Sequence, residues 1–147
     1  MAVNERVVEA TPDEVWSVLA DGWLYPLFVV GASRMRDVDA AWPAVGARLH
    51  HSVGQWPLLI DDTTVIEECA PPRLLRLRAR AWPLAGSAGV TFHLEPQGAR
   101  TLVRLEEDAG RGPGRLVPSP LRQPPLRWRN SETLRRLAYV AEGRARG

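Results

Sequence analysis

Residues 56–68, WPLLIDDTTVIEE, contain the strand around which the rest of the chain can be arranged. Two polar doublets, Asp61-Asp62 and Thr63-Thr64, lie in the middle of this stretch, between the apolar residues 58–60 and 65–66. Because side chains alternate between the faces of a strand, each face receives one Asp and one Thr in either register. Two interpretations remain open: both carboxylates lie in water beyond the packed zone, or one face lines an internal cavity with a carboxylate and a hydroxyl.

The sequence on both sides of this stretch predicts more strands, joined by short connections. Segments such as Ala70-Pro71-Pro72 and Pro96-Gln97-Gly98 are typical of turns, and short loops favour antiparallel neighbours. In residues 73–82, Leu and Ala alternate with Arg, which indicates a half-buried strand whose arginines pair with the acids of residues 61–68 rather than with nucleic acid. The strands are expected at residues 2–10, 32–39, 46–53, 58–69, 73–82, 88–95 and 100–108.

Helices are predicted near both ends of the chain. Thr11-Pro12-Asp13-Glu14 has the composition of a capping box, and Gly22 is a candidate for the end of that helix. A second short helix or an irregular turn fits residues 23–30. A lid-like loop is expected at about residues 109–124, and a long C-terminal helix at about 125–142, with Gly143 as its stop.

The composition is that of a globular domain. The 147 residues are enough for one domain, 45% of them are apolar, and the net charge is only +2. Cys69 is the single cysteine, so no internal disulfide is expected. No signal peptide and no apolar run of membrane-spanning length stand out, which predicts a cytoplasmic protein without a membrane span. The arginines are spread along the chain, so nucleic-acid binding is not expected, and nor is a metal or cofactor site.

The order of these elements, and three short motifs, resemble a known group of proteins. The motifs are Thr-Pro-Asp-Glu-Val-Trp at 11–16, Ala-Pro-Pro-Arg-Leu at 70–74 and Leu-Glu-Glu-Asp at 105–108. With them, the chain resembles the polyketide cyclase/dehydrase-like branch of the START-like, Bet v 1-like (SRPBCC) superfamily. The resemblance implies an α+β helix-grip fold spanning residues 1–147 as a single domain. In that fold a seven-stranded antiparallel sheet curves around the long C-terminal helix, two short helices lie between strands one and two, and the sheet and long helix enclose an elongated apolar cavity.

A candidate catalytic pair lies in the hairpin on either side of residues 54–58. If that hairpin pairs residue 51 with residue 61, His51 faces Asp61, and the register favours Asp61 and Thr63 as the inward pair. A His–Asp pair in an apolar cavity is a reasonable general base, in which the carboxylate orients the imidazole. The alternatives are a structural hydrogen-bonded pair and a His doublet at an exposed hairpin end.

Other residues are candidates for contact with a ligand. Aromatic side chains dominate contacts in small-molecule pockets, and several tryptophans precede proline at the end of a strand, where they would line a cavity mouth or cover the edge of the core. Strand alternation adds Thr63 and Glu107 to these candidates. The predicted inward stripe of the C-terminal helix is polar in its first half and adds Asn130 and Thr133. The predicted ligand-binding residues are Trp56, Thr63, Trp82, Glu107, Asn130 and Thr133.

The leading hypothesis is a protein that binds a lipid-like or polyketide-like hydrophobic small molecule in an internal cavity. The alternative is an enzyme of the same fold, a cyclase or dehydratase that uses His51 with Asp61 or Asp62. A third hypothesis is a regulatory module whose cavity is vestigial. The sequence carries no signal for the oligomeric state.

Overall fold

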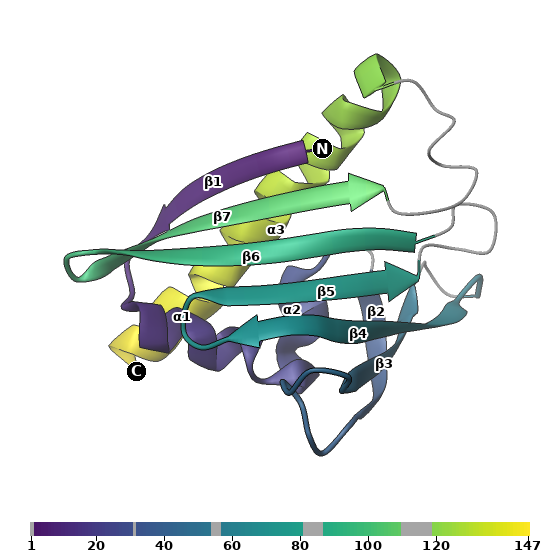
Figure 1. The fold of residues 1–147 in the computed structure, drawn as a ribbon, viewed down its shortest axis with the longest axis horizontal. Coiled ribbons are helices and arrows are strands. Elements are labelled where there is room, and N and C mark those ends of the chain that lie inside the picture. The colour runs from purple at the N-terminus through teal and green to yellow at the C-terminus, as the bar shows by residue number, and fades with distance from the viewer. Residues whose placement is uncertain (1, 31, 54–56, 81–86, 110–118) are drawn as a thin grey trace.

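The fold follows from a computed structural model, which describes residues 2–30, 32–53, 57–80, 87–109 and 119–147. A curved antiparallel sheet forms one layer, and a long C-terminal helix crosses behind it, with the short helices beside the far end of that helix (Figure 1). The sheet has seven strands in the order β1-β7-β6-β5-β4-β3-β2, so β1 and β2 are its two edges. The predicted α+β architecture is confirmed.

The strand bounds agree with the prediction to within a few residues. The largest differences at a strand start are two residues, at β3 and at β4, where Leu58 precedes the strand and is 80% exposed. The seven strands are β1 (Ala2–Val8), β2 (Ala32–Val38), β3 (Arg48–Val53), β4 (Ile60–Ala70), β5 (Leu74–Arg80), β6 (Ser87–Gln97) and β7 (Arg100–Ala109).

The first helix begins where the capping box predicts. The Thr11 hydroxyl accepts the Glu14 N–H at 3.2 Å, and Glu14 Oε1 accepts the Thr11 N–H at 2.9 Å, which satisfies two of the free donors at this helix end. Helix α1 (Pro12–Leu19) is followed by the 3-10 helix η1 (Gly22–Leu24) and by α2 (Tyr25–Phe28).

Gly22 does not end α1, contrary to expectation, and it has another role. It is buried at the start of η1, where a Cβ atom would lie 2.5 Å from Leu49 Cδ2 and 2.8 Å from Val38 Cγ1. Only a residue without a side chain allows η1 to approach the sheet this closely.

The C-terminal helix α3 (Ser119–Arg146) is longer than predicted at both ends. Proline is tolerated in the first turn of a helix, so Pro120 does not prevent the helix from beginning at Ser119. The predicted loop therefore covers six residues that are helical, and its residues 110–118 lie outside the described part of the chain. Gly143 does not stop the helix, because glycine permits a left-handed conformation without requiring one.

The core lies between the inner face of the sheet and the helices. Buried apolar side chains alternate along the central strands and meet the small and branched residues in the second half of α3 and one face of α1. The largest contributions to this core come from Leu49, Ile66, Leu75, Leu77, Phe92, Leu105, Leu134 and Leu137.

The outer face of the sheet carries cross-strand ion pairs. Arg78 pairs with Glu67, and Arg76 lies 3.2 Å from Glu68, so the predicted pairing of the β5 arginines with the acids of β4 is confirmed for these two. His93 also lies on this face, 3.5 Å from Glu106, because alternation places it opposite the buried Phe92 and Leu94. Within the described ranges, no helix combines the length and the apolar character that crossing a membrane requires.

Candidate functional site

The register between β3 and β4 decides which polar residues face the interior. His51 pairs with Asp62 and Ser52 pairs with Asp61, so the expected pairing of His51 with Asp61 is wrong by one residue. Thr64 and Ile66 are buried on the inner face, and alternation places Asp62 with them. The inward pair is therefore Asp62 and Thr64, and the predicted inward pair, Asp61 and Thr63, lies on the outer face.

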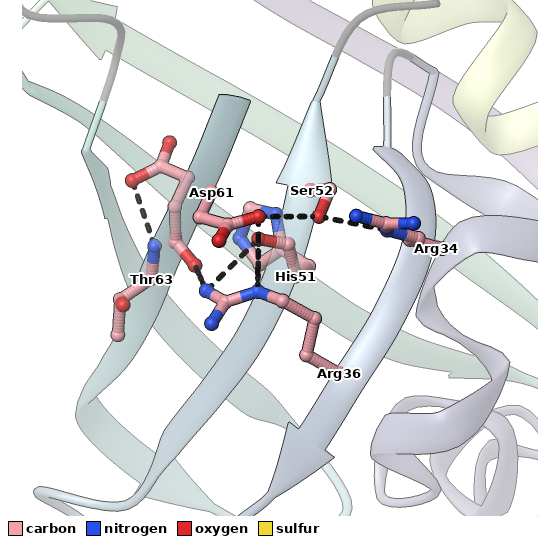
Figure 2. A network of polar contacts seen from close by, with 7 residues as sticks. Arg34, Arg36, His51, Ser52, Asp61 and Thr63 are labelled. Carbon is pink, nitrogen blue, oxygen red and sulfur yellow. Dashed lines mark hydrogen bonds and ion pairs between the residues drawn. The ribbon is translucent and has the colours of Figure 1, made fainter. Parts of the chain in front are cut away.

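On the outer face, Asp61 belongs to a polar network that joins three strands (Figure 2). Its Oδ1 accepts a hydrogen bond from the Ser52 hydroxyl at 2.9 Å and lies 3.4 Å from Arg36 Nε. Arg34 Nε in turn donates to the Ser52 hydroxyl at 3.2 Å. The Asp61 side chain is 62% exposed, so it cannot orient His51 inside the protein.

Arg36 connects this outer network to the backbone behind His51. Its guanidinium donates to the carbonyl oxygens of His51, at 3.2 Å, and of Asp62, at 2.9 Å (Figure 2). Arg36 therefore binds the backbone of both His51 and Asp62. Strand alternation places the side chains of these two paired residues on the inner face. Thr63, the other residue expected inside, lines a depression on the outer face with Val65 and Arg78.

Four buried side chains on the inner side form what we call the inner polar cluster: Tyr25, His51, Thr64 and Glu107. The His51 Nε2 atom lies 2.9 Å from the Thr64 hydroxyl, and the rings of Tyr25 and His51 are 5.3 Å apart at their centroids. Tyr25 reaches this place from α2, while His51, Thr64 and Glu107 come from β3, β4 and β7.

His51 is neutral at physiological pH. Burial disfavours the imidazolium, and the charges of Arg36 and His50 add to this effect, so that its pKa is lowered from 6.5 to about 4. Only 3% of the residue is exposed. A neutral imidazole both donates and accepts a hydrogen bond, and the Thr64 hydroxyl uses one of its two ring nitrogens.

The Tyr25 phenol connects the two sides of the cluster. Burial raises its pKa above 10.0, the Thr64 hydroxyl lowers it by a hydrogen bond, and the negative charge of Glu107 raises it again. Arg129 and Asp62 also act on this pKa by their charge, so the phenol lies among groups from β4, β7 and α3.

Glu107 points inward from β7, as predicted, and is 5% exposed. Its Oε1 forms an ion pair with Arg129, which comes from α3 and keeps 39% of its side chain exposed. The predicted residues Asn130 and Thr133 are also buried on α3. The Thr133 hydroxyl accepts the Val30 N–H at 3.4 Å, which joins α3 to the end of the short-helix segment.

Several polar atoms in this region have no hydrogen-bond partner within the part of the chain that the structure describes. They are His51 Nδ1, Glu107 Oε2 and Asn130 Nδ2, each on a residue that is at least 95% buried. Buried polar groups are nearly always hydrogen-bonded, and leaving one unpaired costs about 1–3 kcal/mol. These atoms are therefore the groups to which a bound molecule could donate or accept.

Small side chains separate the two sides of the inner polar cluster on the sheet. Thr64 pairs with Ala79, and Ala79 pairs with Ala88 on the next strand, so methyl groups continue the row from β4 across β5 and β6. The next row of inward side chains contains Glu107 on β7 and its paired residue on β6, Val90. Ala79, Ala88 and Val90 are only partly buried, whereas the inner-face residues farther along β5 and β6 are fully buried.

Tryptophans were expected to contact a ligand or to cover the edge of the core. Trp56 and Trp82 lie outside the described residues. Trp42 packs against the core and its indole N–H donates to the Leu19 carbonyl at 3.3 Å, so it covers the edge of the core. The described residues contain no group of three or more His, Cys, Asp or Glu side chains that could hold a metal ion.

Tyr25, Thr64 and Arg129 were missed by reasoning from the sequence. Thr64 was missed because the doublet pattern itself favours neither threonine, and the assumed pairing of residue 51 with residue 61 favoured Thr63. Arg129 lies beside the inward stripe of α3, where helical periodicity does not predict an inward contact. Tyr25 lies in a four-residue helix, too short for periodicity to indicate which of its side chains point inward.

Comparison with known proteins agrees with this architecture. The sequence matches no protein-family model, and no curated protein is significantly similar to it. A solved Nitrosomonas europaea protein is 15% identical, with a TM-score of 0.73, over 97% of this chain and 94% of that one. The Zhui aromatase/cyclase from a Streptomyces species is 19% identical, with a TM-score of 0.70, over 97% and 93% of the two chains.

A third similar structure is Ara h 8.0201, which is 9% identical with a TM-score of 0.70 and aligns over 96% of each chain. Identities this low carry the fold and not the activity. The chain thus has the same helix-grip fold as these solved proteins.

Proposed function

We propose that the protein binds a largely apolar small molecule between the inner face of the sheet and α3, next to the inner polar cluster. The observation that carries this proposal is the set of buried, unpartnered polar atoms on His51, Glu107 and Asn130. They lie beside the apolar core between the sheet and α3, so a ligand there would be mostly hydrophobic with a few polar groups.

Two further features support this location. The small side chains of Ala79 and Ala88 leave more room above the sheet than the leucines farther along β5. Ala79 and Ala88 are also only partly buried, unlike the leucines farther along β5. The fold shared with an aromatase/cyclase fits a binding function but does not specify the ligand.

The test replaces a small inward-facing side chain of the sheet with a larger one. Nile red, a neutral apolar dye, is titrated into the wild-type protein and into the variant Ala88→Leu, whose new side chain points inward. The matched control is Ser87→Leu, the adjacent position on the opposite face of β6. We expect Ala88→Leu to weaken binding by about tenfold or more, since inserted methylenes have no room beside a ligand, and Ser87→Leu to leave it unchanged.

Native mass spectrometry of the purified protein is a second measurement and should detect a retained hydrophobic molecule. Equal Nile red affinity in all three proteins would place binding elsewhere and contradict the proposal. A complete lack of binding to the wild-type protein would favour the regulatory-module hypothesis instead.

A second candidate function is acid/base catalysis by His51, as in a cyclase or dehydratase. The specific observation in its favour is that His51 is buried, neutral and paired across the sheet with Asp62, with Nδ1 unpartnered among the described residues. An enzyme should lose turnover of its ligand by roughly a hundredfold or more in His51→Ala. A binding protein should show a modest change in affinity and no chemical change in a retained ligand.

A further inference from the structure

Beyond apolar binding, we propose that the polar end of the ligand is an uncharged hydrogen-bond donor, such as an alcohol or phenol hydroxyl, held by Glu107 Oε2. Ligands that end in a carboxylate are rejected at the same place. This inference rests on the proposed function, because it specifies the chemistry of the ligand at that site.

The hydrogen-bonding state of Glu107 favours a donor group on the ligand. Its Oε1 atom is engaged by Arg129, whereas Oε2 is buried and has no partner among the residues that the structure describes. A carboxylate oxygen only accepts hydrogen bonds, so a ligand group that satisfies Oε2 has to donate one. Hydrogen bonds to charged groups are the stronger ones, which makes this atom a major contact for the polar end of a ligand.

The charges around Glu107 disfavour a ligand carboxylate. The cation beside Glu107 is Arg129, and its guanidinium already pairs with the Glu107 carboxylate. A ligand carboxylate next to Oε2 would place a second negative charge against the first in a buried region. Such pairs of carboxylates strongly disfavour double ionisation.

The side-chain amide of Asn130 also favours a hydroxyl group on the ligand. Asn130, the residue next to Arg129 on α3, has a buried Nδ2 that needs an acceptor. A hydroxyl group both donates and accepts, so one kind of ligand group is able to satisfy Glu107 Oε2 and Asn130 Nδ2. A carboxylate could serve only the second of these atoms.

The test compares three naphthalenes of similar shape as competitors of Nile red at pH 7. The first, 2-naphthol, donates a hydrogen bond; 2-methoxynaphthalene has the same oxygen without the proton; and 2-naphthoic acid is ionised. We expect 2-naphthol to bind about tenfold or more tightly than either of the others. This comparison uses the wild-type protein and does not depend on how any variant folds.

A pair of variants then assigns the preference to Glu107. In Glu107→Gln the preference for 2-naphthol over 2-naphthoate should fall by about tenfold, because the opposing charge is gone. The matched control is Glu106→Gln, the neighbouring carboxylate on the outer face of β7, which should retain the wild-type preference.

The possible failures are distinguishable. If Nile red binds but 2-naphthoate or 2-methoxynaphthalene competes as well as 2-naphthol, this inference is wrong and the proposed apolar site stands. An unchanged preference in Glu107→Gln also overturns it. If neither Nile red nor any naphthalene binds, the proposed function itself is wrong.

Discussion

The Nε2 atom of His51 lies 2.9 Å from the hydroxyl of Thr64, and this contact joins β3 to β4 inside the protein. It is the closest polar contact of the His51 side chain in the described part of the chain, while Asp62 is its paired residue on the neighbouring strand. The adjacent threonine, Thr63, lies on the outer face of the same strand. The two threonines therefore offer a matched comparison of a buried and an outer hydroxyl.

Replacing Thr64 with Val should destabilise the protein by about 1–3 kcal/mol, because the buried His51 Nε2 loses its partner while the shape is retained. Thr63→Val should change the free energy of unfolding by no more than about 0.5 kcal/mol, as is usual for a surface position. Urea denaturation of both variants measures the difference. Equal effects would show that the His51–Thr64 contact contributes little to stability.

The stability should depend on pH through His51. Its pKa is about 4 in the folded protein against 6.5 ordinarily, so between these values the unfolded chain binds a proton that the folded chain does not. The free energy of unfolding therefore falls as the pH is lowered from about 6.5 towards 4, by roughly 3 kcal/mol in total, and this loss is absent above pH 6.5.

Two measurements check this pH dependence. Urea denaturation at pH 7.5 and pH 4.5 should show that His51→Gln loses less stability on acidification than the wild-type protein. In the NMR spectrum, the ring protons of His51 should not titrate above about pH 5. A midpoint near 6.5 for these protons would mean that the imidazole is hydrated and that the proposed burial is wrong.

The ion pair between Arg129 and Glu107 should matter more than a surface pair on the same helix. Arg129→Met leaves the buried Glu107 carboxylate without its cation, and we expect a loss of about 1–3 kcal/mol. Arg135 lies 3.7 Å from Glu132 on the solvent side of α3, and Arg135→Met should cost at most about 1 kcal/mol. Thermal unfolding of both variants provides the comparison, and a larger loss in Arg135→Met would contradict it.

Gly22 and Gly143 should respond in opposite ways to alanine. In Gly22→Ala the new Cβ meets Leu49 and Val38 at well under contact distance, and such overpacking costs about 1–3 kcal/mol. Gly143 lies within α3 and has nothing within 4 Å of a Cβ position, so Gly143→Ala should stabilise the helix by about 0.5–1 kcal/mol. Urea denaturation measures both signs; stabilisation by Gly22→Ala would contradict the close approach of η1 to the sheet.

Much of the fold could be predicted because its signals are local. The capping box at Thr11 and Glu14 depends on residues three apart, and the strands of the sheet follow from alternation and from proline and glycine in the turns. Glu107 and Asn130 were found for the same reason, since strand alternation and helical periodicity indicate which way they point. The ends of α3 were not predicted, because Pro124 and Pro125, where the helix was expected to begin, lie inside it, and Gly143 does not end it.

The register of β4 is what the sequence could not decide. In Asp61-Asp62-Thr63-Thr64 either face receives one acid and one hydroxyl, so the pattern itself carries no preference for Asp61 or Asp62. The sequence alone determined that the inner face would carry an Asp and a Thr. The tertiary structure decided that they are Asp62 and Thr64, because β3 pairs Leu49 with Thr64 and His51 with Asp62, with Ile66 buried on the same face. Tyr25 likewise comes close to Thr64 and Glu107 because α2 packs over distant strands, and no local sequence pattern predicts this.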